Sequence, residues 1–411
     1  MKFSFLPYCE ECGEVRVPHA VYRYVRFPES NVIRSLPVVK QYIELTEACE
    51  RFFDAFWTPE RTLRFMKMLS RIGLASLRTS VQPHDNTRTQ ALYEGAVPAG
   101  VTLYACRILG VPICFVAEKK HGERVFQTLF HIIPRPYAFV SPSLPWLDDK
   151  GKLKEKLVEA KIPCAEGGVA TSEEEAVLLF RAIGRPVIAK PYSGSRGRHT
   201  TLDLRDEADV RKGFCIAEQL MPKVVIEAYL KGTVHRVTLV GGEPVAVARR
   251  EYPHVMGDGV HTVRELVEIE NAKPYRTGTH FRPIDIRHRA DAALRKQGCT
   301  FDSVPGVGKM VILNDKNSRL HGTVTEDVTD SVHPDNLELF RKIGFALGDP
   351  IVGVDFMIGS MEQSWKDQVD AGVIECNSMP FIDVHHQVVS GRTINVAEHL
   401  WNEVMHEKYY R

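Results

Sequence analysis

Residues Pro186 to Thr200, PVIAKPYSGSRGRHT, form the segment on which the predicted fold of this chain rests. A short apolar run ends at Lys190, and the proline that follows ends a strand. In the next loop, glycines let the backbone approach a ligand, and successive N–H groups form a nest for anions. Lys190 and two arginines add charges that match phosphate oxygens. The spacing differs from the P-loop pattern, so we predict a strand followed by a phosphate-binding lid. An ordinary basic turn is the alternative.

Composition bounds the class of protein. The chain has 411 residues, 44% hydrophobic and 26% charged, with a net charge of +1, which predicts a soluble globular protein of two or three domains. The balanced charge argues against a nucleic acid or a membrane surface as the main partner. No apolar run is long enough to span a bilayer, and no signal segment opens the chain. Nine scattered cysteines suit a reducing compartment, so we expect a cytoplasmic protein.

The first third of the chain shows an α/β pattern without recognisable chemistry. Residues 101–105 and 111–116 are apolar runs that predict buried strands or a helix–strand pair. Near the start, Cys9 and Cys12 form a single C-x-x-C, which His19 and Cys49 could complete as a zinc site. The alternative is two local cysteines in a loop. We predict an α/β domain over residues 1–146.

A small α/β unit should follow. We expect an amphipathic helix that opens at Asp149 and ends before Ile162, and a second helix capped by Ser172 with Gly184 just past its end. Asp206 should start a third helix. With the strand at 186–191, these elements predict a small lobe.

The second half of the chain begins with strand signals. Residues 224–232 read as a strand, and the Gly241-Gly242 turn between apolar runs at 237–240 and 245–250 predicts a hairpin. Residues 254–259 and 271–283 are polar and loop-like.

Two late strands carry acidic side chains. Residues 351–358 and 372–377 read as strands, and side chains two apart on a strand share a face, so Glu375 and Asn377 should point the same way. If the strands pair as a hairpin, Asp355 lies beside them. Two carboxylates and an amide oxygen suit Mg²⁺. A solvated polar face is the alternative, and the apolar neighbours of Asp355 and Glu375 argue against it.

Together these pieces resemble the ATP-grasp carboxylate–amine ligases, and among them the ATP-grasp domain of cyanophycin synthetase. The resemblance covers residues 147–405. The residues that carry it are Asp149-Lys150, Ile188-Ala189-Lys190-Pro191, Gly194 and Gly197, 227–232, 248–251, 254–262, Asp302-Ser303-Val304-Pro305, Gly322-Thr323, 327–330 with His333-Pro334, Gly353-Val354-Asp355 and Glu375-Cys376-Asn377.

The resemblance implies an α/β (α+β) ATP-grasp fold, in which two α/β lobes grip ATP. Residues 147–223 would form the small nucleotide-lid lobe and residues 224–405 the catalytic lobe, with the domain over residues 1–146 in front of them.

The resemblance also implies site residues. Nucleotide contacts would come from Lys150, Lys190, Ser193, Gly194, Ser195, Arg196, Gly197, Glu227, Ala228, Tyr229, Leu230 and His235. Asp355, Glu375 and Asn377 would hold two Mg²⁺, with Mn²⁺ as a substitute. Arg236, Arg249 and Arg250 would be catalytic, because they would neutralise the transferred phosphoryl group and the acyl phosphate.

For the amine acceptor we expect His385 or His386, with Arg392, to recognise an anionic group, the histidine being protonated near neutral pH. Two histidines in a solvated turn, before a helix that begins near Thr393, are the alternative.

The implied reaction joins a small-molecule or peptide carboxylate to an amine through an acyl phosphate and releases ADP and phosphate. The alternatives are a phosphotransferase and a lapsed nucleotide-binding module. A homodimer or higher homo-oligomer is compatible with each of these functions. The chain departs from the resemblance at Val234, where an acid would meet the ribose, and at Phe381, where the family has glycine. We see no second ligase domain after residue 405, so polymerisation is not implied and we expect one bond per acceptor.

Overall fold

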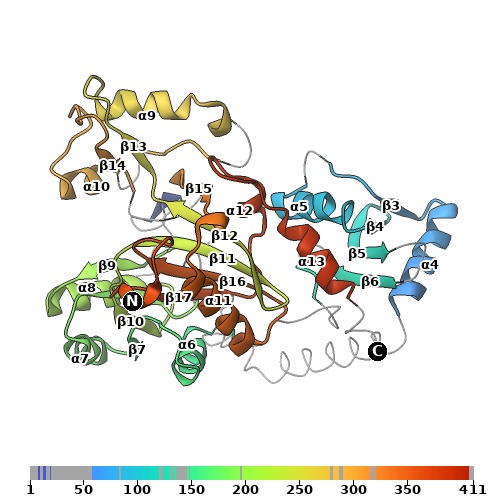
Figure 1. Ribbon diagram of the computed structural model, residues 1–411, viewed down its shortest axis with the longest axis horizontal. Coiled ribbons are helices and arrows are strands. Elements are labelled where there is room, and N and C mark those ends of the chain that lie inside the picture. The colour runs from blue at the N-terminus through green and yellow to red at the C-terminus, as the bar shows by residue number, and fades with distance from the viewer. Residues whose placement is uncertain are drawn as a thin grey trace.

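The computed structural model describes residues 8–9, 13–14, 19, 58–82, 85–119, 124–129, 133–135, 146–147, 149–194, 197–277, 281–286, 290–314, 317 and 321–406. Its elements are arranged around three larger sheets, seen from one side in Figure 1. Cys12 and Cys49 lie outside the described residues, so the zinc hypothesis stays a prediction. Within the described residues, no helix has the length and apolar character needed to cross a bilayer.

The first of these sheets lies near the start of the chain and is antiparallel, in the order β3 (Ala75–Arg78), β4 (Val101–Ile108), β5 (Val111–Lys119) and β6 (Arg124–Leu129). The two apolar runs are therefore strands of one hairpin, β4–β5, as one of the two sequence alternatives had it. Helix α4 (Pro59–Arg71) buries Leu63 and Met66 against this sheet. A two-residue pair, β1 (Tyr8–Cys9) and β2 (Gly13–Glu14), precedes these elements.

The end of the chain returns to the first sheet. Helix α13 (Val396–Val404) packs against α5 (Thr87–Ala96), and the two helices lie side by side in Figure 1. The Trp401 indole is fully buried there, and its Nε1 donates a hydrogen bond of 2.8 Å to the carbonyl oxygen of Leu92. One apolar core thus joins residues on both sides of the predicted boundary at residue 146, which remains a prediction.

The second sheet has the order β7 (Gly167–Ala170), β10 (Val224–Ala228), β8 (Val187–Pro191) and β9 (Thr201–Leu204). Helices α7 (Glu173–Ile183) and α8 (Glu207–Glu218) pack on it through Val177 and Phe214. The side chains of Ser172 and Asp206 cap the two helices, and Gly184 ends α7 in the left-handed conformation with φ 66°. These predictions from the sequence are confirmed.

The third sheet has the order β15 (Val324–Asp327), β12 (Glu243–Glu251), β11 (Thr233–Val240), β16 (Ile351–Ile358) and β17 (Gly372–Asn377). The predicted hairpin is present as β11–β12, with both turn glycines at positive φ. Helix α11 (Pro334–Leu347) packs on this sheet. Helix α6 (Lys150–Glu159) begins at the Asp149 cap as predicted, but its Leu153 and Leu157 lie in the core of the third sheet rather than the second.

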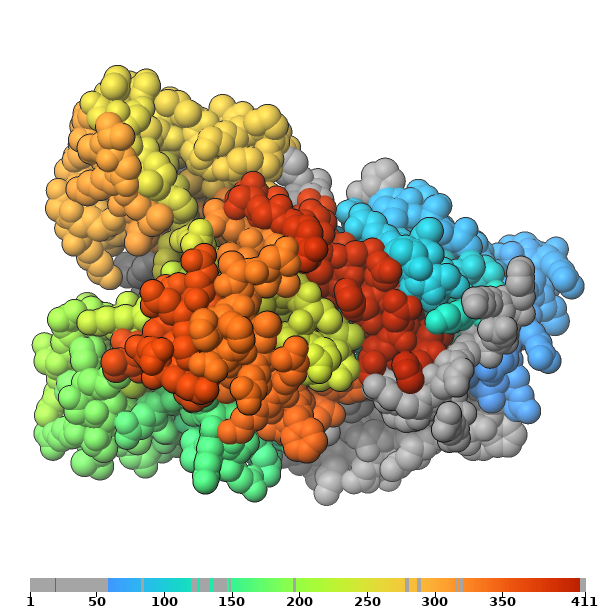
Figure 2. Space-filling view, in the orientation of Figure 1, coloured from blue at the N-terminus to red at the C-terminus, as the bar shows by residue number. Residues whose placement is uncertain are grey.

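A module that the sequence did not predict projects from the third sheet. Strands β13 (His254–Met256) and β14 (Met310–Ile312) pair, and helices α9 (Val263–Asn271) and α10 (Ala290–Lys296) pack beside them on a separate core. It occupies one corner of the molecule in Figure 1, drawn in yellow and orange, and stands out in Figure 2. The loop expected at 254–259 is therefore wrong for 254–256. In the described part of 271–283, Asn271 is the last residue of α9 and Pro274–Arg276 form a short 3-10 turn. The sequence pattern did not predict these elements because their apolar runs are short and flanked by polar residues.

Candidate active site

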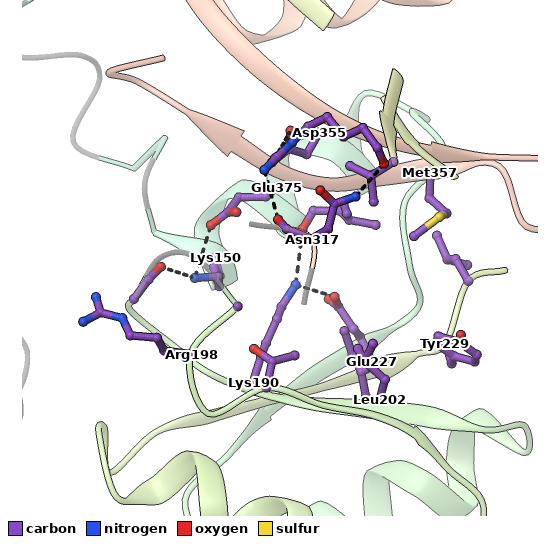
Figure 3. A pocket seen from close by; sticks show the side chains of 18 of the residues that line it. Lys150, Lys190, Arg198, Leu202, Glu227, Tyr229, Asn317, Asp355, Met357 and Glu375 are labelled. Atoms are coloured by element: carbon purple, nitrogen blue, oxygen red, sulfur yellow. Dashed lines mark hydrogen bonds and ion pairs between the residues drawn. The ribbon is translucent and has the colours of Figure 1, made fainter. Parts of the chain in front are cut away.

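A cavity of about 280 Å³ lies between the second and third sheets. Figure 3 shows side chains from both sheets pointing into it. Its walls come from β8, β9, β10 and the lid loop on one side, and from β11, β12, β16 and β17 on the other. Stretches that the sequence analysis singled out separately, 186–200, 227–230, 250, 355 and 375–377, meet around one space.

One part of this cavity is apolar. Ile188 and Leu202 line it from the second sheet, and Val234, Met357 and Ile374 line it from the third. Ala228, Tyr229 and Leu230 also line it, where the chain passes from β10 toward β11. Apolar walls next to a backbone segment suit a heteroaromatic ring. Val234, where the resemblance implied an acid, lies in this wall at 7% exposure among apolar neighbours.

At the floor of the cavity, Glu227 is paired with two lysines. Its Oε1 accepts a hydrogen bond from Lys190 Nζ, and its Oε2 lies 3.0 Å from Lys154 Nζ. Lys190 also donates to the carbonyl oxygen of Ile374 at 3.2 Å. Burial opposes ionisation of Glu227, but the charges of Lys190 and Lys154 outweigh that effect and lower its pKa. Glu227 is thus a buried carboxylate with two cations.

The lid loop contacts the polar end of the cavity. Lys150 Nζ donates to the carbonyl oxygen of Gly194 at 3.3 Å and lies 3.5 Å from Glu375 Oε1. Gly194, Gly197 and Arg198 line the cavity. Gly194 and Gly197 have φ values of 151° and 63°, which glycine adopts without strain. Ser193 does not line the cavity, and the predicted Ser195 and Arg196 lie outside the described residues.

On the third sheet, Asp355 and Arg236 form a buried bidentate pair. Arg236 Nε lies 2.7 Å from Asp355 Oδ1, and Nη2 lies 3.0 Å from Oδ2. Arg250 Nη1 is 3.9 Å from the same carboxylate. Burial works against the charge of Asp355, but Arg236 and then Arg250 lower its pKa below the ordinary value. The aspartate is therefore an anion among cations.

The predicted adjacency of the acids is confirmed. Strands β16 and β17 pair antiparallel, with Asp355 directly opposite Glu375 and Gly353 opposite Asn377. All three predicted metal ligands line the cavity. Two carboxylates and an amide are hard oxygen donors of the kind Mg²⁺ takes, so the donor set fits that ion. Among the described residues, no group of three or more His, Cys, Asp or Glu side chains is arranged to hold a metal ion.

Strand alternation divides the predicted arginines. Arg236 and Arg250 face the cavity, whereas Arg249 and His235 are directly opposite each other on the other face of β11–β12. Arg249 Nε is 3.1 Å from Glu326 and 2.9 Å from Glu251. His235 is buried, which lowers its pKa to about 4. Neither residue lines the cavity, so the structure does not bring them to the predicted nucleotide site.

The predicted acceptor histidines are buried. They lie in the short helix α12 (Asp383–His386), so the alternative of a solvated turn is wrong. His385 Nε2 is 2.7 Å from the hydroxyl of Thr238, and burial lowers its pKa to about 3. Burial lowers the pKa of His386 too. The prediction of a histidine protonated near neutral pH is therefore wrong, because desolvation disfavours the imidazolium.

Arg392, the third predicted acceptor residue, lies at the surface. Its Nη2 is 2.8 Å from Asp330, and it is not among the residues that line the cavity. The next helix, expected to begin near Thr393, is α13, whose N-cap is Asn395. The acceptor role of these three residues remains a prediction.

Several cavity residues were missed by the sequence analysis. Tyr252 and Asn317 line the cavity, and Lys154 lies behind Glu227. Lys154 follows Lys150 by four residues on one helix, a spacing that places both on the same face. This spacing could have identified Lys154 from the sequence. Asn317 exchanges two hydrogen bonds with Arg250, at 3.0 and 2.6 Å, and no sequence pattern indicated that contact.

Comparisons with known proteins identify relatives. No family model matches the chain. It is 31% identical over 255 residues to a cyanophycin synthetase of Crocosphaera subtropica, covering 61% of this chain and 29% of the relative. It is 32% identical over 280 residues to a bifunctional glutathione biosynthesis protein of Mannheimia succiniciproducens, covering 65% and 37%. The chain thus spans about a third of the length of these relatives.

A solved structure supports the same grouping. The crystal structure of a bifunctional glutathione synthetase from Pasteurella multocida matches with a TM-score of 0.57 and 27% identity, over 77% of this chain and 43% of that one. The matching sequences and this shared architecture, with a cavity between two sheets, agree with the resemblance drawn from the motifs. The chain is a member of the ATP-grasp superfamily, with cyanophycin synthetases and bifunctional glutathione synthetases among its relatives.

Proposed function

We propose that the protein is an ATP-dependent carboxylate–amine ligase that forms an amide or peptide bond through an acyl phosphate and releases ADP and phosphate. One observation carries this proposal: an apolar slot and a set of paired carboxylates and cations share one cavity between two sheets. A heteroaromatic base fits the first part and a polyphosphate the second. The names of the relatives, two kinds of synthetase, support the same reaction class.

In this proposal the nucleotide base lies between Ile188, Leu202 and Met357, next to the backbone of 228–230. The triphosphate extends toward Lys150 and Lys190, which both line the cavity. Each of these lysines is now paired with a carboxylate, Lys150 with Glu375 and Lys190 with Glu227. Phosphate oxygens would therefore take over lysine contacts that glutamates hold.

Asp355, Glu375 and Asn377 would hold Mg²⁺, which offsets negative charge on the transferring phosphoryl group. We propose two ions, with Mn²⁺ as a substitute. Arg236 and Arg250 face the same end and stabilise charge on the phosphoryl oxygens and on the acyl phosphate. Arg236 does so while bound to Asp355, which fixes the orientation of its guanidinium.

The proposed reaction has two steps. A substrate carboxylate first attacks the terminal phosphorus of ATP, and ADP leaves. An amine then attacks the acyl carbon, so that phosphate leaves and the amine loses a proton. The loop around Gly194 and Gly197 closes on this end of the cavity, where it excludes water that would hydrolyse the intermediate. We also propose a cytoplasmic location and the division into 1–146, 147–223 and 224–405.

The test is release of ADP from ATP and Mg²⁺ with the twenty amino acids and short peptides as carboxylates, with and without hydroxylamine. The proposal predicts that at least one carboxylate stimulates ADP release and that hydroxylamine converts it to a hydroxamate detectable by mass. A product that retains phosphate would indicate a phosphotransferase instead. Absence of ATP binding by calorimetry would contradict both.

A further inference from the structure

Lys154 lies on the far side of Glu227 from the nucleotide cavity. Lys190 and Glu227 line both that cavity and a smaller space behind it, whereas Lys154 lines only the smaller one. The Glu227 carboxylate lies between the two ammonium groups. Lys190 Nζ contacts Oε1, and Lys154 Nζ lies 3.0 Å from Oε2. Lys154 also donates to the carbonyl oxygen of Ala165.

Glu227 is 3% exposed. Among the described residues, the other titratable groups that line the smaller space are Cys164 and Lys150, and burial raises the pKa of the Cys164 thiol. Cys164 is thus neutral near pH 7. The ionised form of an isolated buried carboxyl group is strongly disfavoured, so Glu227 would take up a proton if both lysines left.

We infer that Lys154 is a positioning residue that keeps Glu227 ionised when Lys190 turns from Glu227 to a nucleotide phosphate. With two cations and one carboxylate, one lysine can leave while the charge of Glu227 stays paired. This inference rests on the proposed nucleotide site. It assigns to Lys154 no contact with the nucleotide, because the residue does not line the nucleotide cavity.

The inference predicts a change in proton balance. In Lys154→Met, Lys190 is the one cation still paired with Glu227 among the described residues. ATP binding then either leaves Lys190 on Glu227 or leaves Glu227 buried without a cation, and the second case requires uptake of a proton. We expect ATP affinity to fall at least about tenfold, to fall further as pH rises from 6 to 8, and binding to take up as much as one proton.

The experiment is calorimetric titration of the full chain with ATP and Mg²⁺ at several pH values, in buffers of different ionisation enthalpy, which gives affinity and protons together. Lys156→Met is the matched control, since Lys156 is on the same helix but half-exposed and paired with Glu159 at 2.8 Å. It should bind as the wild type does. Lys154→Arg retains the charge and should also bind without proton uptake.

The double variant Lys154→Met with Glu227→Gln separates this role from others. With the buried charge removed, its ATP affinity should exceed that of Lys154→Met and its proton uptake should vanish. It also serves if the single variant does not fold. The inference is overturned if Lys154→Met binds as the wild type, or if the double variant is as weak as the single one, since Lys154 would then act on the nucleotide itself. A wild type that fails to bind ATP overturns the nucleotide site instead.

Discussion

The two faces of the β11–β12 hairpin carry similar residues in different environments. On one face Arg236 and Arg250 point toward the cavity and share Asp355. On the other, Arg249 binds Glu326 and Glu251, and its neighbour His235 is buried and neutral. Arg249 and Arg250 are adjacent in the chain and alike in charge. Period-two alternation of the strand alone separates a cavity arginine from one outside it.

In this sheet, the environment of a charged side chain depends on its partner and on the face of the strand where it lies. Asp355 is held by arginines in a buried site that also lines the cavity, so we expect it to matter both for stability and for the proposed reaction. Glu375, directly opposite, has a side chain that is one-third exposed and a longer contact to Lys150. Mutations at these positions should therefore separate stability from activity.

The largest effect is expected for Asp355→Asn. Removal of the carboxylate charge leaves Arg236 buried without its counterion, so the free energy of unfolding should fall by about 3–5 kcal/mol, and turnover should be lost. Urea unfolding followed by circular dichroism measures the first effect. Glu375→Gln is the control: it should lose turnover with a stability change below about 1 kcal/mol. Equal destabilisation by both variants would contradict the distinction.

The next largest effect is expected for Arg250→Ala, on the face of the β11–β12 hairpin that lines the cavity. If Arg250 stabilises charge in the transition state, its removal should lower kcat about 10²–10³-fold. Steady-state ADP release measures it, with Arg249→Ala as the matched control one residue away. Should Arg249→Ala be as slow as Arg250→Ala, the assignment of faces to function is wrong.

The opposing wall of the cavity is probed by Lys190→Ala. A charged hydrogen bond to phosphate contributes about 1.5–3 kcal/mol, so the dissociation constant for ATP should rise roughly 10- to 150-fold. Calorimetry measures it. Lys152→Ala is a suitable control, because this lysine is mostly exposed on α6. Unchanged affinity in Lys190→Ala would move the nucleotide elsewhere.

On the face of the β11–β12 hairpin that does not line the cavity, the prediction concerns His235 and the pH dependence of stability. His235 has a folded-state pKa of about 4 against an ordinary value of 6.5, so between these values the unfolded state binds the extra proton. Stability is complete above pH 6.5 and falls as pH decreases, by about 2 kcal/mol at pH 5 from this residue. In His235→Gln the fall between pH 7 and pH 5 should be smaller by that amount. Identical urea midpoints in the two proteins across this range would refute the burial argument.

The smallest effect is expected for Arg249→Ala. Its ion pairs are partly exposed, so stability should change by less than about 1 kcal/mol and kcat should stay near that of the wild type. Thermal unfolding and ADP release check both. A tenfold loss of activity would show that the far face contributes to the reaction.

The sequence determined the elements of the site. Helix caps at Asp149, Ser172 and Asp206, the Gly-Gly hairpin and the two late strands with their acids follow from local rules of capping, turns and alternation, and all are present. The superfamily followed as well, because many short motifs stand in one order. These features depend on residues that are close together in the chain, so they can be predicted from the sequence.

Tertiary structure alone decided which charges pair and which are neutral. The contact of Lys154 with Glu227 spans 73 residues and that of Arg236 with Asp355 spans 119. The burial of His385 depends on packing that joins α12 to β11. The faces of Arg249 and Arg250 required the register of β11 against β12. Electrostatic energies change with distance and desolvation, and neither can be read from a sequence before distant segments are brought together.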